Sequence, residues 1–88
     1  MKAEVEVRED QTNVIHLDGT KIEVSAAGNV TAYTNSPVQM KPALATEGPH
    51  LSVYFNAVSV HGVKIEKAPE GGLNVYTTGT VTLLPPAL

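Results

Sequence analysis

The chain has 88 residues, a formal net charge of −3 and no cysteine. Its length rules out a large single-chain core, the lack of cysteine rules out disulfides and thiolate metal sites, and the acidic charge argues against a nucleic-acid-binding domain. Apolar residues make up 42% of the chain but aromatic residues only 5%, so the core must consist of Val, Ile, Leu and Ala. Because so thin a core favours association, we predict a homo-oligomer, with a trimer ahead of a dimer.

The first predicted strand covers residues 3–7, in which apolar and acidic residues alternate (AEVEV). The first ten residues lack the apolar run of a signal peptide, and no segment has the length and apolarity of a membrane span. We therefore expect a soluble protein with neither a signal peptide nor a transmembrane segment.

An internal repeat begins at residue 13. Residues 13–42 align with residues 56–85 without a gap, at an offset of 43, and ten of the thirty aligned pairs are identical. A further predicted strand, LSVYF at residues 51–55, precedes the second copy. The repeat predicts one all-β domain over residues 1–88, made of two tandem units at 3–42 and 51–85 that are joined by a linker at 43–50.

Each unit divides again into octads, such as KIEVSAAG and NVTAYTNS, in which about five strand residues precede about three turn residues. The second and fourth places of the octads are mostly apolar, and side chains two residues apart share one face of a strand, so we expect both places to face the core. Ile15 and Val58 are exceptions on the other, mainly polar face. The expected inward residues are Val14, Ile22, Val30, Val38, Ala57, Ile65, Leu73 and Val81, then His16, Val24, Ala32, Met40, Ser59, Lys67, Val75 and Leu83.

Two architectures accept five-residue strands at a period of eight. In an antiparallel meander each octad reverses, and the two units form two small sheets that pack face to face as a sandwich. In an intertwined trimeric β-helix or β-prism, octads from three chains wind around one axis and bury their apolar stripe along it. Regular Gly and Pro breaks argue against a helix anywhere in the chain, and the sequence leaves both all-β architectures open.

The octads resemble those of the triple-stranded β-helix in phage cell-puncturing spikes and in the valine–glycine-repeat spike protein of type VI secretion. The resemblance covers residues 13–42 and 56–85 and rests on the period of eight and the apolar second place. It implies an intertwined homotrimer that serves as a structural or attachment component of a phage or phage-like tail spike. It also implies a location in the virion or the host cytoplasm, and a protein or envelope glycan as partner. The alternative is a small β binding module for a protein or ligand, for example a phage-encoded inhibitor.

No triad spacing, nucleophile elbow or phosphate loop is present, so we predict a non-enzymatic protein without a cofactor. His16 and Asp18 alternate onto one strand face and are the candidates for a metal site. The second unit carries Ser59 and His61 at the matching places. Because the pairing is not repeated, we favour a structural histidine over a metal ligand.

Glu23 and Glu66 match across the repeat, and each follows Lys-Ile. We expect cross-strand Lys–Glu pairs on a solvated face rather than the carboxylates of a glycosidase.

Tyr33 and Tyr76 also match across the repeat, and each precedes a threonine, Thr34 or Thr77. These four residues form the candidate binding surface, for a sugar or a protein partner. The other interpretation is that the tyrosines cap the ends of a thin core.

Overall fold

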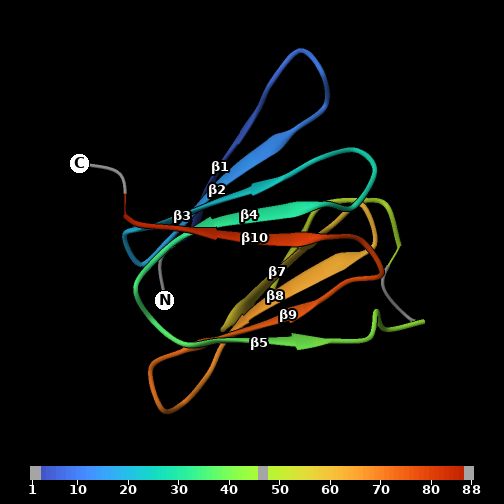
Figure 1. Ribbon diagram of the computed structural model, residues 1–88. Coiled ribbons are helices and arrows are strands. Elements are labelled where there is room, and N and C mark those ends of the chain that lie inside the picture. Colours follow the sequence, from blue (N-terminus) through green and yellow to red (C-terminus); the bar gives the residue numbers. More distant parts are fainter. Residues whose placement is uncertain (1–2, 46–47, 87–88) are drawn as a thin grey trace.

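The computed structural model describes residues 3–45 and 48–86, which form ten strands and no helix (Figure 1). The prediction of an all-β fold is therefore confirmed. In chain order the strands are β1 (Ala3–Val7), β2 (Asn13–Leu17), β3 (Thr20–Val24), β4 (Val30–Tyr33), β5 (Val38–Lys41), β6 (Ser52–Val53), β7 (Ala57–Val60), β8 (Val63–Lys67), β9 (Leu73–Tyr76) and β10 (Val81–Leu84).

The strands form two five-stranded sheets, which we call sheet A (β1-β2-β3-β4-β10) and sheet B (β5-β9-β8-β7-β6). Strands β1 to β4 form an antiparallel meander, and so do β6 to β9. The last strand of each unit crosses to the other sheet, where β10 pairs in parallel with β4 and β5 pairs in parallel with β9. Of the two predicted architectures, the single chain therefore adopts the sandwich of meanders, with one strand exchanged in each direction.

The strand exchange follows the same geometry in both units. Backbone hydrogen bonds at both ends of each exchanged strand have counterparts 43 residues away. They are Val30 N to Thr80 O (2.8 Å) and Leu73 N to Pro37 O (2.9 Å) at one end, and Thr34 N to Leu84 O (2.9 Å) and Thr77 N to Lys41 O (3.1 Å) at the other. The repeat in the sequence thus corresponds to two structurally equivalent halves.

A single core lies between the sheets and contains only Val, Ile, Leu and Ala, as the composition predicts. Its packing holds both sheets together, because the apolar faces of β2 to β4 and of β7 to β9 contribute equally. Its members are Ile15, Leu17, Ile22, Val24, Val30 and Ala32 from sheet A and Val58, Val60, Val63, Ile65, Leu73 and Val75 from sheet B.

In β2 and β7 the predicted residues do not face the core between the sheets, although Val14, Ala57 and Ser59 are themselves buried. Ile15 lies opposite Ile22 and Val58 lies opposite Ile65, so these two exceptions to the octad pattern face the core, whereas His16 lies on the outer face. The cause is the two-residue turn after each strand, in which Asp18–Gly19 and His61–Gly62 all have positive φ. Across a two-residue turn, odd-numbered residues of one strand lie opposite even-numbered residues of the next strand. The octad pattern has an even period and assigns residues of the same parity to the core in both strands. It therefore predicts the wrong face for one strand of each hairpin.

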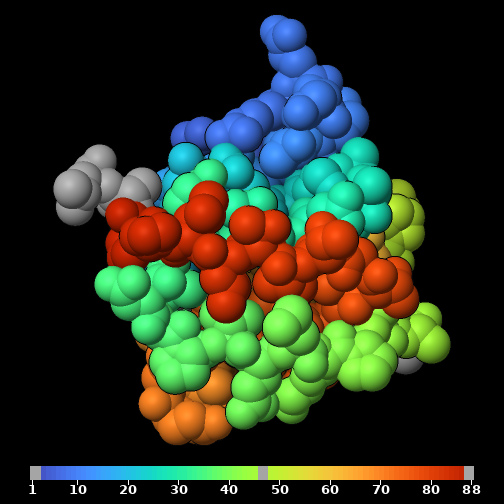
Figure 2. All heavy atoms as spheres, viewed as in Figure 1, coloured from blue at the N-terminus to red at the C-terminus, as the bar shows by residue number. Residues whose placement is uncertain are grey.

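Met40 and Leu83, also expected to be inward, are 66% and 49% exposed. They lie on β5 and β10, the strands at one edge of each sheet, which have a neighbouring strand on only one side. In the space-filling view these edges, coloured green and red, adjoin across one face of the molecule (Figure 2). The octad pattern identifies strand residues but does not show which strands lie at an edge.

Candidate functional site

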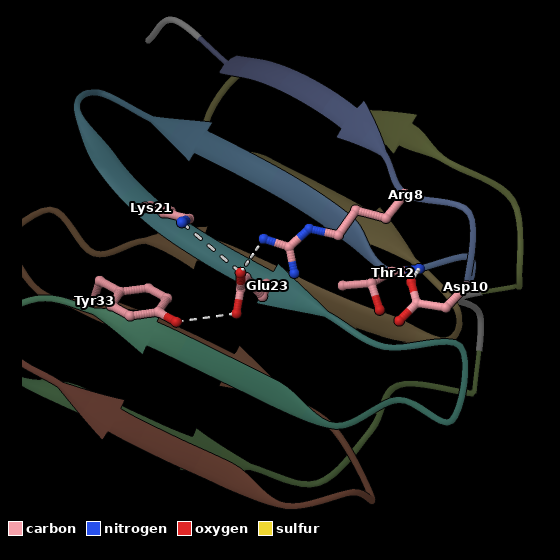
Figure 3. Close-up of polar contacts among 6 residues, drawn as sticks. All are labelled: Arg8, Asp10, Thr12, Lys21, Glu23 and Tyr33. Atoms are coloured by element: carbon pink, nitrogen blue, oxygen red, sulfur yellow. Dashed lines mark hydrogen bonds and ion pairs between the residues drawn. The ribbon is translucent and has the colours of Figure 1, made fainter. Parts of the chain in front are cut away.

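A polar cluster lies on the outer face of sheet A, where β3 supplies Lys21 and Glu23 and β4 supplies Tyr33 (Figure 3). These side chains point away from the core because they alternate with Ile22 and Ala32. The Tyr33 hydroxyl donates a hydrogen bond of 3.1 Å to Glu23 Oε1. Lys21 Nζ lies 5.0 Å from the Tyr33 ring centroid and 3.8 Å from Glu23 Oε2, so the lysine contacts both partners.

Arg8, from the loop after β1, completes this cluster. Its Nη2 lies 2.6 Å from Glu23 Oε2, and its side chain is half exposed. The loop is ordered by Asp10, whose Oδ1 accepts a hydrogen bond of 3.0 Å from the Thr12 backbone N–H. That bond lowers the pKa of the Asp10 carboxyl, because it stabilises the charged form.

The surroundings of Tyr33 change the acidity of its hydroxyl. Its hydrogen bond to Glu23 raises the pKa of the hydroxyl, since the bond requires the proton, and desolvation and the Glu23 charge act in the same direction. The phenol therefore stays neutral and keeps its bond to the carboxylate well into the alkaline range. The arrangement holds the ring in place beside two cations.

The same Lys–Glu–Tyr arrangement occurs on the outer face of sheet B. Lys64 and Glu66 on β8 stand beside Tyr76 on β9, with Lys64 opposite Tyr76 in register. The Tyr76 hydroxyl donates to Glu66 Oε1 at 3.4 Å, and Lys64 Nζ lies 4.0 Å from Glu66 Oε2. Since the core faces of the two sheets pack against each other, the two clusters face in opposite directions.

Further residues around the sheet B cluster differ from those in sheet A. Lys41, on the exchanged strand β5, places Nζ 5.6 Å from the Tyr76 ring centroid, and Lys64 Nζ also lies 5.5 Å from the Tyr54 ring. Asn74 Nδ2 donates to Glu66 Oε1 at 3.1 Å. The second cation thus contacts the carboxylate in sheet A, where it is Arg8, and the aromatic ring in sheet B, where it is Lys41.

Basic side chains concentrate in the two clusters. Among the described residues, Arg8, Lys21, Lys41 and Lys64 belong to them, and Lys67 instead pairs with Asp18 at 2.7 Å. On the outer face of sheet A, Glu4 and Glu6 of β1 share the face with the cluster. The sheet B cluster combines two cations with one carboxylate, so it is locally positive on a chain whose net charge is −3. This charge pattern suits an acidic ligand.

The carboxylates Glu23 and Glu66 do form lysine pairs on the outer faces, as expected. The pairing differs in one detail, because each lysine lies two residues earlier on the same strand instead of on a neighbouring strand. In both sheets the tyrosine hydroxyl is a cross-strand partner of the glutamate, and in sheet B Asn74 is a second one.

Of the predicted binding residues, Tyr33 and Tyr76 are half-buried on the outer faces and are not among the core residues. Thr34 and Thr77 lie at the start of the crossovers. Thr34 Oγ1 accepts a hydrogen bond from Ser36 N at 2.9 Å, and Thr77 Oγ1 accepts one from Gly79 N at 3.0 Å. Thr77 also donates to Gly28 O at 2.7 Å, so both threonines support the crossover backbone.

His16 and Asp18, the metal candidates, line a shallow cavity of about 350 Å³ together with Glu4 and Glu6. Asp18 Oδ2 accepts a hydrogen bond from Lys67 of sheet B at 2.7 Å. Within residues 3–45 and 48–86, no group of three His, Asp or Glu side chains is placed to hold a metal ion.

The sequence reasoning missed Arg8 and Lys41 as members of the clusters. Neither has a matching basic residue at the 43-residue offset, so the repeat gives no indication of them. The repeated Lys-Ile-Glu and Tyr were the usable signal, because they place a lysine, a carboxylate and a ring in each unit.

A search of protein-family models, of curated proteins and of solved structures finds no match to this chain. In the described part of the chain, no helix has the length and apolarity needed to cross a membrane.

Proposed function

We propose that the protein is a non-catalytic β binding module whose two outer faces recognise acidic segments of a protein partner. The observation that carries this proposal is the duplication of the Lys–Glu–Tyr cluster on both outer faces. These side chains lie outside the core, so packing between the sheets does not require them. Two equivalent clusters that face opposite ways suit a module that engages two segments at once.

The chemistry of the clusters supports an acidic protein segment as the ligand. Each tyrosine offers a ring with a large apolar area at a low cost in side-chain entropy, and the adjacent lysines supply charge for carboxylates. Glu23 and Glu66 already accept hydrogen bonds from the tyrosine hydroxyls, which fixes the rings before any ligand arrives. Fixed rings lower the entropic cost of binding.

A closed sandwich favours this role over the structural spike component. One chain buries a continuous core from both sheets, whereas a β-prism depends on three intertwined chains for its core. The spike role remains the alternative, and it predicts a trimer that survives detergent. Light scattering coupled to size exclusion distinguishes it from the binding module.

The test is an NMR titration of the ¹⁵N-labelled protein with a short glutamate-rich peptide. We expect chemical-shift changes around Lys21, Tyr33, Lys64 and Tyr76 that weaken as salt is raised, since exposed charges are screened. The matched peptide with glutamine in place of glutamate should produce no such changes.

Variants assign the shifts to individual clusters. Tyr33→Ala should abolish the changes on sheet A alone, Tyr76→Ala those on sheet B alone, and the double substitution both. Thr82→Ala, at an exposed position on β10 outside both clusters, is the control. Shifts that occur elsewhere, or only with a neutral oligosaccharide, would reject the proposed acidic partner.

A further inference from the structure

The sandwich has four edge strands, and they are protected to different degrees. An edge strand offers unpaired backbone groups to another chain, and proteins limit this with charges or prolines. β1 carries Glu4 and Glu6, β5 begins directly after Pro37, and β10 is followed directly by Pro85–Pro86. The residues around β6, Leu-Ser-Val-Tyr at 51–54, contain neither a charge nor a proline, and no Asp, Glu, Lys or Arg follows before Lys64.

The β6 edge is also apolar and exposed. Leu51 is 45% exposed, Val53 59%, and Phe55 at the hairpin tip 89%. On β1, the equivalent strand of sheet A, Val5 packs against the core instead. The two first strands therefore differ, although the strands that follow them are matched.

The backbone of this segment is oriented for pairing. Tyr54 N donates to Ala57 O at 2.8 Å, which closes the β6–β7 hairpin, and Ser52 lies opposite Ser59 in the ladder. Hydrogen-bonding direction alternates along an antiparallel strand. Ser52 and Tyr54 therefore direct their backbone groups towards β7, and Leu51 and Val53 direct theirs away from it, to the side where sheet B ends.

We infer that two copies of this chain associate through antiparallel pairing of residues 51–53 about a twofold axis at Ser52. The two B sheets then form one continuous ten-stranded sheet. Leu51 lies opposite the partner's Val53 on one face, and Ser52 lies opposite the partner's Ser52 on the other. The backbone groups of Leu51 and Val53 form the new ladder.

A second copy is the occupant that this edge fits, because the pairing is self-complementary. Apolar side chains meet apolar side chains, and no charged side chain lies within the paired segment. The same arrangement about β1 would bring Glu4 and Glu6 of two copies together, and like charges on neighbouring strands destabilise a sheet. The inference is independent of the tyrosine clusters, but the dimer would place two sheet B clusters on one outer face.

Val53→Lys tests the inference, with Val7→Lys as its matched control. Val53 and Val7 both lie on first strands and are 59% and 60% exposed, so the two substitutions should be tolerated equally in the monomer. We expect the wild-type chain, of 9.3 kDa, to show twice this mass by light scattering at high protein concentration. Val53→Lys should show the monomer mass and Val7→Lys the dimer mass, with unchanged circular dichroism for both.

Three outcomes would overturn the inference: a wild-type monomer at every concentration, a Val53→Lys variant that stays dimeric, or a trimer that this substitution leaves intact. The acidic-peptide titration can be repeated on the Val53→Lys monomer. Failure of the dimer and failure of the proposed function are therefore distinguishable.

Ser52→Cys tests the position of the axis. The chain has no cysteine of its own, and directly opposite residues in a non-hydrogen-bonded pair lie about 4.5 Å apart, within disulfide range. We expect a covalent dimer after mild oxidation. Glu4→Cys, at the equivalent place on β1, should stay monomeric on a denaturing gel. A Ser52→Cys variant that fails to cross-link while Val53→Lys disrupts the dimer would overturn the Ser52-centred register.

Discussion

The two sheets share an interior and differ at their first strands. Ile22 and Ile65, 43 residues apart, are both almost fully buried, and the outer faces carry matching Lys–Glu–Tyr clusters. By contrast, β1 has five residues with two carboxylates, whereas β6 has two residues and no charge. The shared core and clusters lie mainly in the repeated segments, and the first strands, which precede those segments, differ in charge and length. The first strands therefore lie outside the duplicated segments, and of the two only β1 carries charged side chains.

The core provides the strongest test of this equivalence. Ile22→Ala and Ile65→Ala should each lower the free energy of unfolding by about 2–5 kcal/mol, because each leaves a cavity at a fully buried site. Urea denaturation monitored by circular dichroism measures both losses. Each variant should unfold in one transition, since the sheets share a core and exchange strands. Losses that differ several-fold, or two separate transitions, would contradict the equivalence.

The crossovers should respond unequally. A Cβ on Gly79 would lie 2.4 Å from the Gly28 carbonyl oxygen and 2.6 Å from Asn29 Oδ1, so Gly79→Ala should cost about 1–3 kcal/mol. The matching residue, Ser36, is exposed and already has a side chain, so Ser36→Ala should change stability by less than about 0.5 kcal/mol. Both are measured by urea denaturation. Equal effects would show that the two crossovers are packed alike.

The smallest expected effect is the titration of Tyr33. Because its folded-state pKa is raised, the folded chain keeps this proton after the unfolded chain has released it. The stability contributed by this bond is therefore complete below the unfolded pKa of about 10 and is lost as the pH rises above it. In a Tyr54→Phe, Tyr76→Phe background, absorbance at 295 nm reports Tyr33 alone. Glu23→Gln should move its pKa back towards the ordinary value, and an unchanged pKa would mean that Glu23 is not the cause.

Much of the fold follows from the repeat, because alternation and regular turns specify strands and their number. The repeat does not show which sheet β5 and β10 join. Their octads match those of the other strands, and only packing between residues more than thirty positions apart favours parallel pairing with the other unit over a further antiparallel hairpin. The core side of β2 depends on a single feature, the length of the Asp18–Gly19 turn, which the period of eight does not reveal.

The candidate site was predictable only in part. The matched Tyr33 and Tyr76 indicated a pair of equivalent surfaces, and the matched Lys-Ile-Glu motifs indicated solvated Lys–Glu pairs, but the contact between tyrosine and glutamate was not predicted. Arg8 and Lys41 reach the clusters from a loop and an exchanged strand, so their roles depend on tertiary structure. The sequence shows that β1 carries charged residues and that β6 does not. This difference bears on association between chains only because both strands lie at the edge of a sheet, which the sequence does not show.

The strand exchange has a consequence for synthesis of the chain. Sheet A pairs Val30 with Val81, so the first half cannot complete its own sheet until residues 81–84 have left the ribosome. Until then the open side of β4 is available to any extended segment, including β5 of the same nascent chain. Contacts of such high sequence separation slow folding. The arrangement joins the halves into one folding unit, and neither half acquires all five strands of its sheet before the other is made.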